Sequence, residues 1–171
     1  ITGSRFYCDN NLKLAYGGLS PQISNYVPKT VSLAGMVLNQ TASSIGVSLQ
    51  NYNQFGNSNT SKPKMNYGII AYNSALNVQA TMFQNIADID KYGKLGGTSI
   101  YSSNQYGYGS LIETGLGKQN STPTISNSYR SIYIDHGTAT IKQNFISSCD
   151  FGPTLYYSPG GNSLFESNKI I

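Results

Sequence analysis

Four short segments of this chain repeat one pattern, and the repetition limits the folds that the chain can adopt. Each alternates apolar and polar residues and ends in Asn, Ser, Asp, Pro or Gly. The segments are GIIAYNS (68–74), TSIYSSN (98–104), SIYIDHG (131–137) and TLYYSPG (154–160). The aligned aliphatic residues are Ile70, Ile100, Ile132 and Leu155. Their unequal spacing along the chain is typical of stacked repeats with uneven loops.

A second set of similar segments alternates with the first. Its members are LNVQATMFQN (76–85), TISNSY (124–129), TIKQNF (140–145) and SLFESN (163–168). Charged residues make up only 11% of the chain, while 18 glycines and 14 tyrosines are present. This composition favours short strands over helices. We therefore predict an all-β fold, a parallel β-solenoid, in which longer loops cover 51–66 and 104–122.

The segments NYGIIAYNSALNVQATMFQN (66–85) and TATIKQNFISSC (138–149) resemble rungs of the right-handed parallel β-helix of the pectin lyase-like type. Such rungs recur in large secreted and cell-surface bacterial proteins, including substrates of type IX secretion. The resemblance covers roughly residues 30–171, and we expect one β-helix domain over 1–171. The spacing of the aligned aliphatic residues gives rungs of roughly 23–32 residues, a usual length for solenoid repeats. Residues 1–30 would form a first rung or cap with a loop, and 31–171 the stacked rungs. A β-sandwich is the alternative, but hairpin signals such as Asn-Gly are absent.

Strand alternation assigns the aligned residues to two faces. The residues expected to point into the helix are Ile70, Tyr72, Ile100, Ser102, Ile132, Ile134, Leu155 and Tyr157. Tyr101, Tyr133 and Tyr156 would then form one outward column with a spacing of about 4.8 Å. Stacked aromatic rings at this spacing are candidates for binding sugar rings. The alternatives are that the ladder stabilises the sheet or that a loop covers it.

The only histidine, His136, directly follows Asp135, so this stretch is either an active site or a charged corner of a rung. If the chain is an enzyme, the candidate catalytic residues are Asp135, His136, Asp150, Lys142 and Arg130. Glycoside hydrolysis requires two carboxylates that face one sugar bond, and only Asp135 and Asp150 lie on neighbouring rungs near the histidine. We interpret the stretch as a structural corner.

Metal and cofactor sites are not indicated by the sequence. Two cysteines and one histidine do not provide a zinc site. The stretch 88–93 (DIDKYG) lacks the remaining ligands of a calcium loop. Cys8 and Cys149 would lie several rungs apart, on the order of 20–30 Å, which is too far for a disulfide bond. We therefore expect free thiols, no metal and no cofactor.

The net charge of +4 comes from dispersed residues, so a nucleic-acid surface is not expected. No apolar stretch approaches the roughly 20 residues of a membrane span. We expect a non-catalytic β-helix segment of a longer, extracellular or cell-surface bacterial protein, which acts as an adhesin, a stalk or a glycan-binding surface. The expected partners are polysaccharides or cell-surface glycans and, through a sorting domain outside this chain, the secretion machinery. The alternatives are a polysaccharide lyase or glycoside hydrolase, and a phage tail-spike domain.

Overall fold

The computed structural model describes residues 1–6, 34–46, 52–57, 65–87, 96–104, 109–115, 123–156 and 162–171. All regular elements in this part of the chain are β-strands. They are β1 (Arg5–Phe6), β2 (Ala34–Asn39), β3 (Ala42–Ile45), β4 (Asn53–Phe55), β5 (Tyr67–Tyr72), β6 (Ala75–Gln79), β7 (Thr81–Gln84), β8 (Thr98–Ser103), β9 (Ser110–Thr114), β10 (Ile125–Ser126), β11 (Arg130–Asp135), β12 (Thr138–Lys142), β13 (Phe145–Ser147), β14 (Thr154–Tyr156), β15 (Leu164–Glu166) and β16 (Lys169–Ile170). No helix in the described ranges has the length and apolar character needed to cross a membrane.

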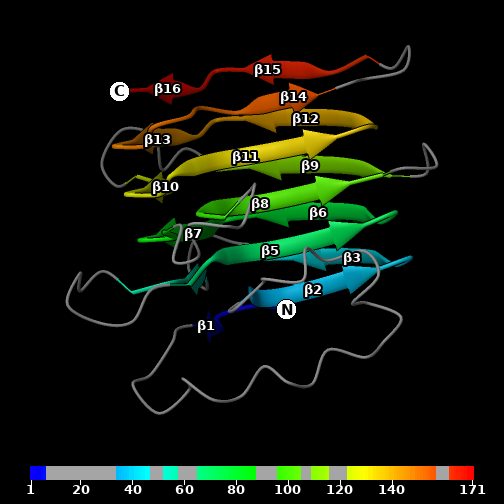
Figure 1. Cartoon of the computed structure of the whole chain (residues 1–171), viewed down its shortest axis with the longest axis horizontal. Coiled ribbons are helices and arrows are strands. Elements are labelled where there is room, and N and C mark those ends of the chain that lie inside the picture. The colour runs from blue at the N-terminus through cyan, green and yellow to red at the C-terminus, as the bar shows by residue number, and fades with distance from the viewer. Residues whose placement is uncertain are drawn as a thin grey trace.

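The strands form three sheets, which we name A, B and C. Sheet A has the order β1-β4-β7-β10-β13-β16, sheet B β14-β11-β8-β5-β2 and sheet C β15-β12-β9-β6-β3. Neighbouring strands within each sheet are parallel. Each rung, such as β5-β6-β7, gives one strand to each sheet, and successive rungs stack along the molecule (Figure 1). The predicted parallel β-helix is confirmed.

The register differs from our sequence alignment at two rungs. Ile69, rather than Ile70, pairs with Ile100, which is a shift of one position. Leu155 pairs with Ile134 rather than Ile132, which is a shift of two positions. The predicted pairing of Ile132 with Ile100 is confirmed.

The shift of one position corrects the predicted faces of β5. Ile70 and Tyr72 belong to a cluster on the outer face of sheet B, whereas Ala71 packs in the space that the three sheets enclose. We call this enclosed space the lumen. The predicted inward placement is confirmed for the aliphatic residues Ile100, Ile132, Ile134 and Leu155, which all pack in the lumen. Tyr157 lies outside the described residues.

The lumen holds the main hydrophobic core. In sheet A one inward column runs through Phe6, Phe55, Phe83, Ile125, Ile146 and Ile170. The rings of Phe6 and Phe55 stack with centroids 4.5 Å apart, and those of Phe55 and Phe83 with centroids 5.1 Å apart. Phe55 and Phe83 are fully buried. This inner aromatic ladder therefore ties three consecutive strands of sheet A together.

The corners between sheets are made by residues with left-handed backbone. In the described part of the chain, the non-glycine residues with positive φ are Gln40, Asn73, Ala80, Asn85, Asn127, His136, Gln143, Ser148 and Ser167. Such a residue still donates its backbone N–H to the next rung: Asn73 to the Ser103 carbonyl at 2.9 Å and His136 to the Tyr156 carbonyl at 3.0 Å. The hydrogen-bond ladder therefore continues through the corners. Asn, which tolerates this conformation, is frequent there.

Ala80 provides a test of this corner geometry, because alanine adopts left-handed backbone (φ 44°) only at a cost of about 1–2 kcal/mol. We expect Ala80→Gly to be about 1 kcal/mol less destabilising than Ala139→Gly. Both alanines are buried, and both substitutions remove a methyl group and increase the conformational entropy of the unfolded chain. Only Ala80 gains relief from strain, since Ala139 lies inside β12. Urea unfolding of the two variants measures the difference, and equal losses would contradict the corner assignment.

Cys149 follows one of these corners and packs partly against the lumen core. It is a free thiol, as predicted, and Cys8 lies outside the described residues. Burial raises the pKa of the Cys149 thiol. The thiol therefore stays protonated at neutral pH and has little nucleophilic character.

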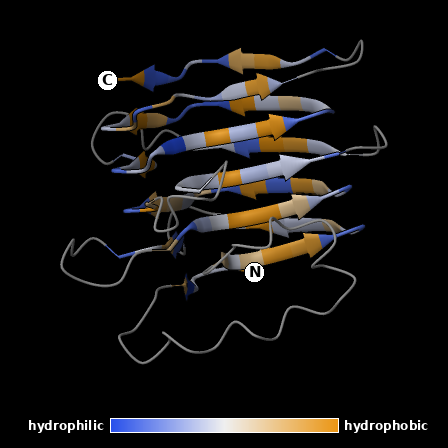
Figure 2. Cartoon of the chain, in the orientation of Figure 1, coloured by the Kyte–Doolittle hydropathy of each residue, from blue (hydrophilic) through white to orange (hydrophobic). Residues whose placement is uncertain are grey.

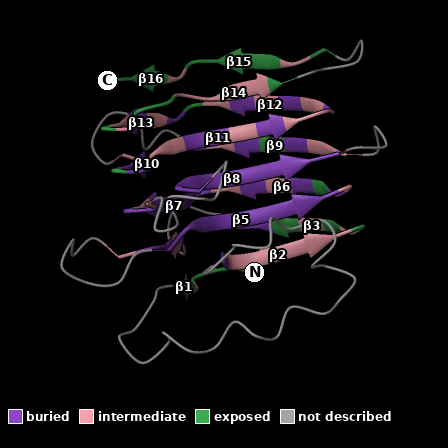
Figure 3. Cartoon of the chain, in the orientation of Figure 1, coloured by how far each residue is buried: buried purple, intermediate pink, exposed green. Residues whose placement is uncertain are grey.

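The outer faces of sheets B and C differ in burial. Strands β5 and β8 of sheet B are buried along their whole length (Figure 3). Outward residues of this sheet form a second apolar cluster that includes Tyr67, Ile70 and Tyr101. The hydropathy colouring shows the middle of β5 as strongly apolar (Figure 2). On sheet C, by contrast, strand residues alternate between buried inward and exposed or half-buried outward positions. Sheet C therefore presents the more accessible face.

Candidate functional site

The three tyrosines proposed as a sugar platform do not form one column. Tyr101 and Tyr133 are paired and stack with centroids 6.0 Å apart, as predicted. Tyr156 instead pairs with Asp135, one outward position further along the strand. Tyr101 is only 7% exposed, whereas Tyr156 is 60% exposed. The single-column prediction is therefore wrong, because Leu155 aligns with Ile134, and the glycan-binding role of the tyrosines stays a prediction.

The buried tyrosines of sheet B are held in the neutral form. Burial raises the pKa of the Tyr101 phenol, and a hydrogen bond from Ser103 offsets this only partly. Burial also raises the pKa of Tyr72, with further contributions from the neighbouring Tyr101 and Tyr67 phenols. Tyr72 and Tyr101 meet edge to face with centroids 6.0 Å apart. This group therefore resembles a second core more than a reactive surface.

Asp135 and His136 form a contact at the corner between sheets B and C. The Nδ1 atom of His136 lies 2.6 Å from an Asp135 carboxylate oxygen. His136 has a φ of 59°, and its backbone carbonyl accepts a hydrogen bond from the side chain of Asn104 at 2.9 Å. The histidine thus occupies the corner position that Gln40 and Asn73 fill in earlier rungs. His136 therefore lies at the turn between β11 and β12, as predicted, and whether the corner has a catalytic role stays a prediction.

The other candidate catalytic residues lie elsewhere on the β-helix. Lys142 pairs with Glu166 at 3.0 Å on the outer face of sheet C. Arg130 begins β11, the strand that Asp135 ends. A span of five residues separates them by about 16 Å. The Arg130 guanidinium lies over the Tyr129 and Phe151 rings, 4.5 and 5.2 Å from their centroids. Among the five candidates, the described contacts join only Asp135 and His136.

Asp150, the remaining candidate, is exposed beside Phe151 at the corner between sheets A and B. That corner precedes β14, whereas the Asp135–His136 corner follows β11. A hydrolase of the usual type needs its two carboxylates on either side of one bond. The placement of Asp135 and Asp150 at different corners does not provide that arrangement.

Glu113 is a polar residue of the interior that the sequence analysis did not single out. It lies in β9, is fully buried, and pairs with Val78 on one side and Ile141 on the other. Burial raises its pKa from 4.5 to about 8, although a hydrogen bond from Asn144 opposes the shift. The sequence feature that could have identified Glu113 as an inward residue is SLIET (110–114), where alternation places Glu113 on the same side as Leu111.

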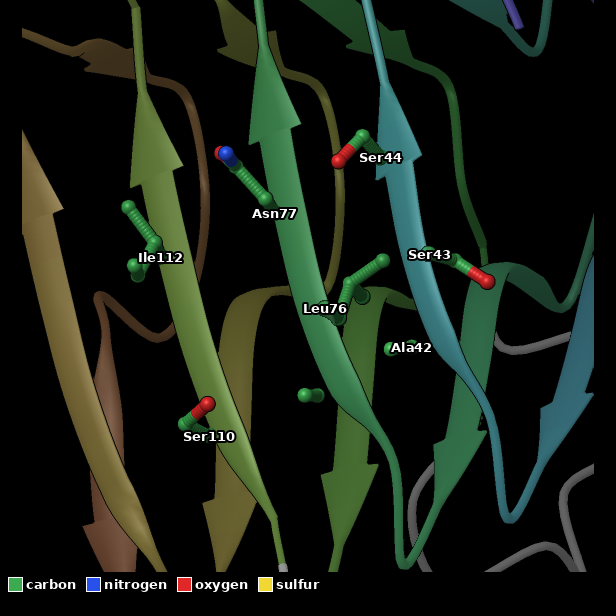
Figure 4. Close-up of a pocket in the computed structure, with 8 residues that line it drawn as sticks. Ala42, Ser43, Ser44, Leu76, Asn77, Ser110 and Ile112 are labelled. Atoms are coloured by element: carbon green, nitrogen blue, oxygen red, sulfur yellow. The ribbon is translucent and has the colours of Figure 1, made fainter.

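The outer face of sheet C carries a shallow groove of about 250 Å³ across β3, β6 and β9 (Figure 4). Its lining residues are Ala42, Ser43, Ser44, Ala75, Leu76, Asn77, Ser110 and Ile112. None of them is charged. The side-chain oxygen of Asn77 is buried and has no hydrogen-bond partner, and Ile112 is 43% exposed. The groove thus combines an apolar surface with a buried amide oxygen that has no partner.

The described ranges contain no group of three or more His, Cys, Asp or Glu side chains arranged to hold a metal ion. The stretch 88–93, considered above as a calcium loop, lies outside these ranges. In comparisons with protein-family models, curated proteins and solved structures, the chain matches none.

Proposed function

We propose that this chain is a non-catalytic β-helix segment of a secreted or cell-surface bacterial protein, a rigid scaffold that contacts neutral glycans through the groove on sheet C. The low charge of the chain and its resemblance to pectin lyase-like rungs support the extracellular assignment. The stacked rungs with a packed lumen support the scaffold role. The observation that carries the glycan assignment is the uncharged groove with its unpaired Asn77 oxygen.

The chemistry of the groove favours a neutral ligand. A buried acceptor without a partner costs about 1–3 kcal/mol. A turn of the Asn77 side chain that brought this oxygen to a sugar hydroxyl would recover part of that cost. Ile112 offers apolar surface to the C–H face of a sugar ring, and Ser44 and Ser110 offer hydroxyl groups at the rim. Among its described lining residues there is no lysine or arginine. An acidic polymer would therefore find no counter-charge there.

Binding to an array of neutral and acidic polysaccharides tests this proposal. We expect a neutral glycan to bind and Ile112→Glu to weaken it at least about ten-fold, because the substitution places a charge in the groove. We expect Asn77→Ala to weaken it by a similar factor, which corresponds to about 1.4 kcal/mol. Ser147→Glu, on the outward side of sheet A, is the matched control. Absence of neutral-glycan binding, or equal effects of all three substitutions, would contradict the groove.

The contact between Asp135 and His136 favours a second candidate, a polysaccharide lyase or hydrolase, which the same samples test. Every glycan that binds is assayed for released reducing ends, with Asp135→Asn alongside the unmodified chain. We expect no release from either protein. Release that disappears in Asp135→Asn would establish catalysis at this corner. The triple substitution of Tyr101, Tyr133 and Tyr156 by alanine tests whether glycan binding depends on the tyrosines instead of the groove.

A further inference from the structure

The carboxylic acid of Glu113 lies inside the lumen of this β-helix. The residues on either side of it in the same inward column of sheet C are apolar. The column of sheet C runs through Ile45, Val78, Glu113, Ile141 and Phe165. Val78, Glu113 and Ile141 are each 0% exposed. Burial of an ionised carboxylate without a positive partner is strongly unfavourable. This environment therefore favours the neutral, protonated form of the Glu113 side chain.

The hydrogen bonds around Glu113 fit a protonated acid better than a carboxylate. The side-chain amide of Asn144 donates to one carboxyl oxygen, Oε2, while Oε1 is buried and has no partner. The same amide also donates to the Lys142 carbonyl at 2.9 Å and the Asn168 side-chain oxygen at 3.3 Å. A single NH₂ group is thus shared among three acceptors. It cannot supply the several strong bonds that stabilise a buried charge.

No cation of the described residues balances the acid. The facing positions on β6 and β12 are Val78 and Ile141, and the corner before β13 contributes Asn144. The charged residue next in sequence on β12, Lys142, points outward and is paired with Glu166 at 3.0 Å. Thr124 reaches the site only through the oxygen of Asn144, at 2.9 Å. Among the described residues, the only neutralising group for Glu113 is therefore a proton.

We infer that Glu113 is a pH-sensitive element of the stack: the rungs pack closely while it holds its proton, and loss of that proton loosens β9 from β6 and β12. The loosened strand also carries Ser110 and Ile112 on its outer side, two residues of the groove. The inference does not depend on what the groove binds.

The sign of the effect follows from the two protonation states. In the folded chain the pKa of Glu113 is raised to about 8, against 4.5 for the ordinary side chain. The stability that protonated Glu113 provides is fully present below pH 4.5. It falls as pH rises further, because Glu113 ionises at a lower pH in the unfolded chain than in the folded chain. Between these two pKa values the unfolding equilibrium constant rises about ten-fold per pH unit, and it levels off above the folded pKa.

Urea unfolding between pH 5 and pH 9 tests the inference with three proteins: the unmodified chain, Glu113→Gln and Glu166→Gln. We expect Glu113→Gln to remove the ten-fold rise per pH unit, because the amide is neutral in both states. Glu166→Gln, at an exposed position, is expected to keep it. At pH 9, hydrogen exchange of the amides in 110–114 is expected to be faster in the unmodified chain than in Glu113→Gln.

An infrared measurement keeps the test decisive if Glu113→Gln folds poorly. The folded, unmodified chain is expected to show the carboxyl band of one protonated acid at pH 6 and to lose it as pH passes about 8. Equal pH dependence in the unmodified chain and Glu113→Gln would overturn the inference. Absence of the protonated band at pH 6 would overturn it as well.

Discussion

Phe83→Ala is expected to remove about 3–5 kcal/mol from the free energy of unfolding, the usual loss when a buried phenylalanine is truncated. Phe83 is fully buried in the lumen, where its ring stacks on Phe55 at a centroid distance of 5.1 Å. Phe55 stacks in turn on Phe6. Truncation therefore leaves a cavity at one end of a ladder that spans three strands of sheet A. Urea unfolding followed by circular dichroism measures the loss.

Ile112→Ala is the matched control for the lumen. Ile112 also lies in a central rung, but it is 43% exposed on the outer face of sheet C. Surface substitutions of this kind usually change stability by no more than about 0.5 kcal/mol. A loss for Phe83→Ala that did not exceed the loss for Ile112→Ala would mean that the enclosed column is not the core of the fold.

The fold class could be predicted from the sequence because its signal is spread over many copies. Alternating apolar residues recur in every rung, and the polar corners between them are rich in Asn, Gly and Ser. Such a pattern needs no single residue to be placed correctly. The three parallel sheets confirm it.

The register could not be predicted at β5 because both faces of that strand are buried. Ile69 packs in the lumen, while Ile70 and Tyr72 pack in the outer cluster of sheet B. All six residues of β5 are buried. Alternation assigns faces only where one face is polar, so the sequence offers two adjacent isoleucines with no means of choosing between them. The outer cluster thus explains both the wrong face predicted for Ile70 and Tyr72 and the burial of Tyr101.

The sequence predicts longer loops over 51–66 and 104–122, but both stretches contain a strand, and the second contains the interior acid Glu113. The stretch 51–66 contains β4 (Asn53–Phe55), and the stretch 104–122 contains β9 (Ser110–Thr114). Polar residues such as Asn53 and Glu113 occupy inward positions there and interrupt the apolar pattern. Asn53, fully buried, accepts a hydrogen bond from the Ser4 backbone at 2.9 Å. Pattern-based reasoning rejects such strands, because it treats inward polar residues as signs of a loop.

Gly68→Ala is expected to cost about 3 kcal/mol, at the upper end of the range for overpacking. A β-carbon at Gly68 would overlap the Ser99 carbonyl oxygen of the neighbouring strand and lie 2.6 Å from Cδ1 of Phe83. The Ser99 carbonyl is backbone and cannot rotate away, so β5 and β8 would have to separate. Gly152→Ala is the matched control, since its nearest neighbour would be Cδ1 of Ile170 at 3.9 Å. It should stay within about 0.5 kcal/mol of the unmodified chain. Equal losses in urea unfolding would show that the close approach of β5 and β8 at Gly68 is not required.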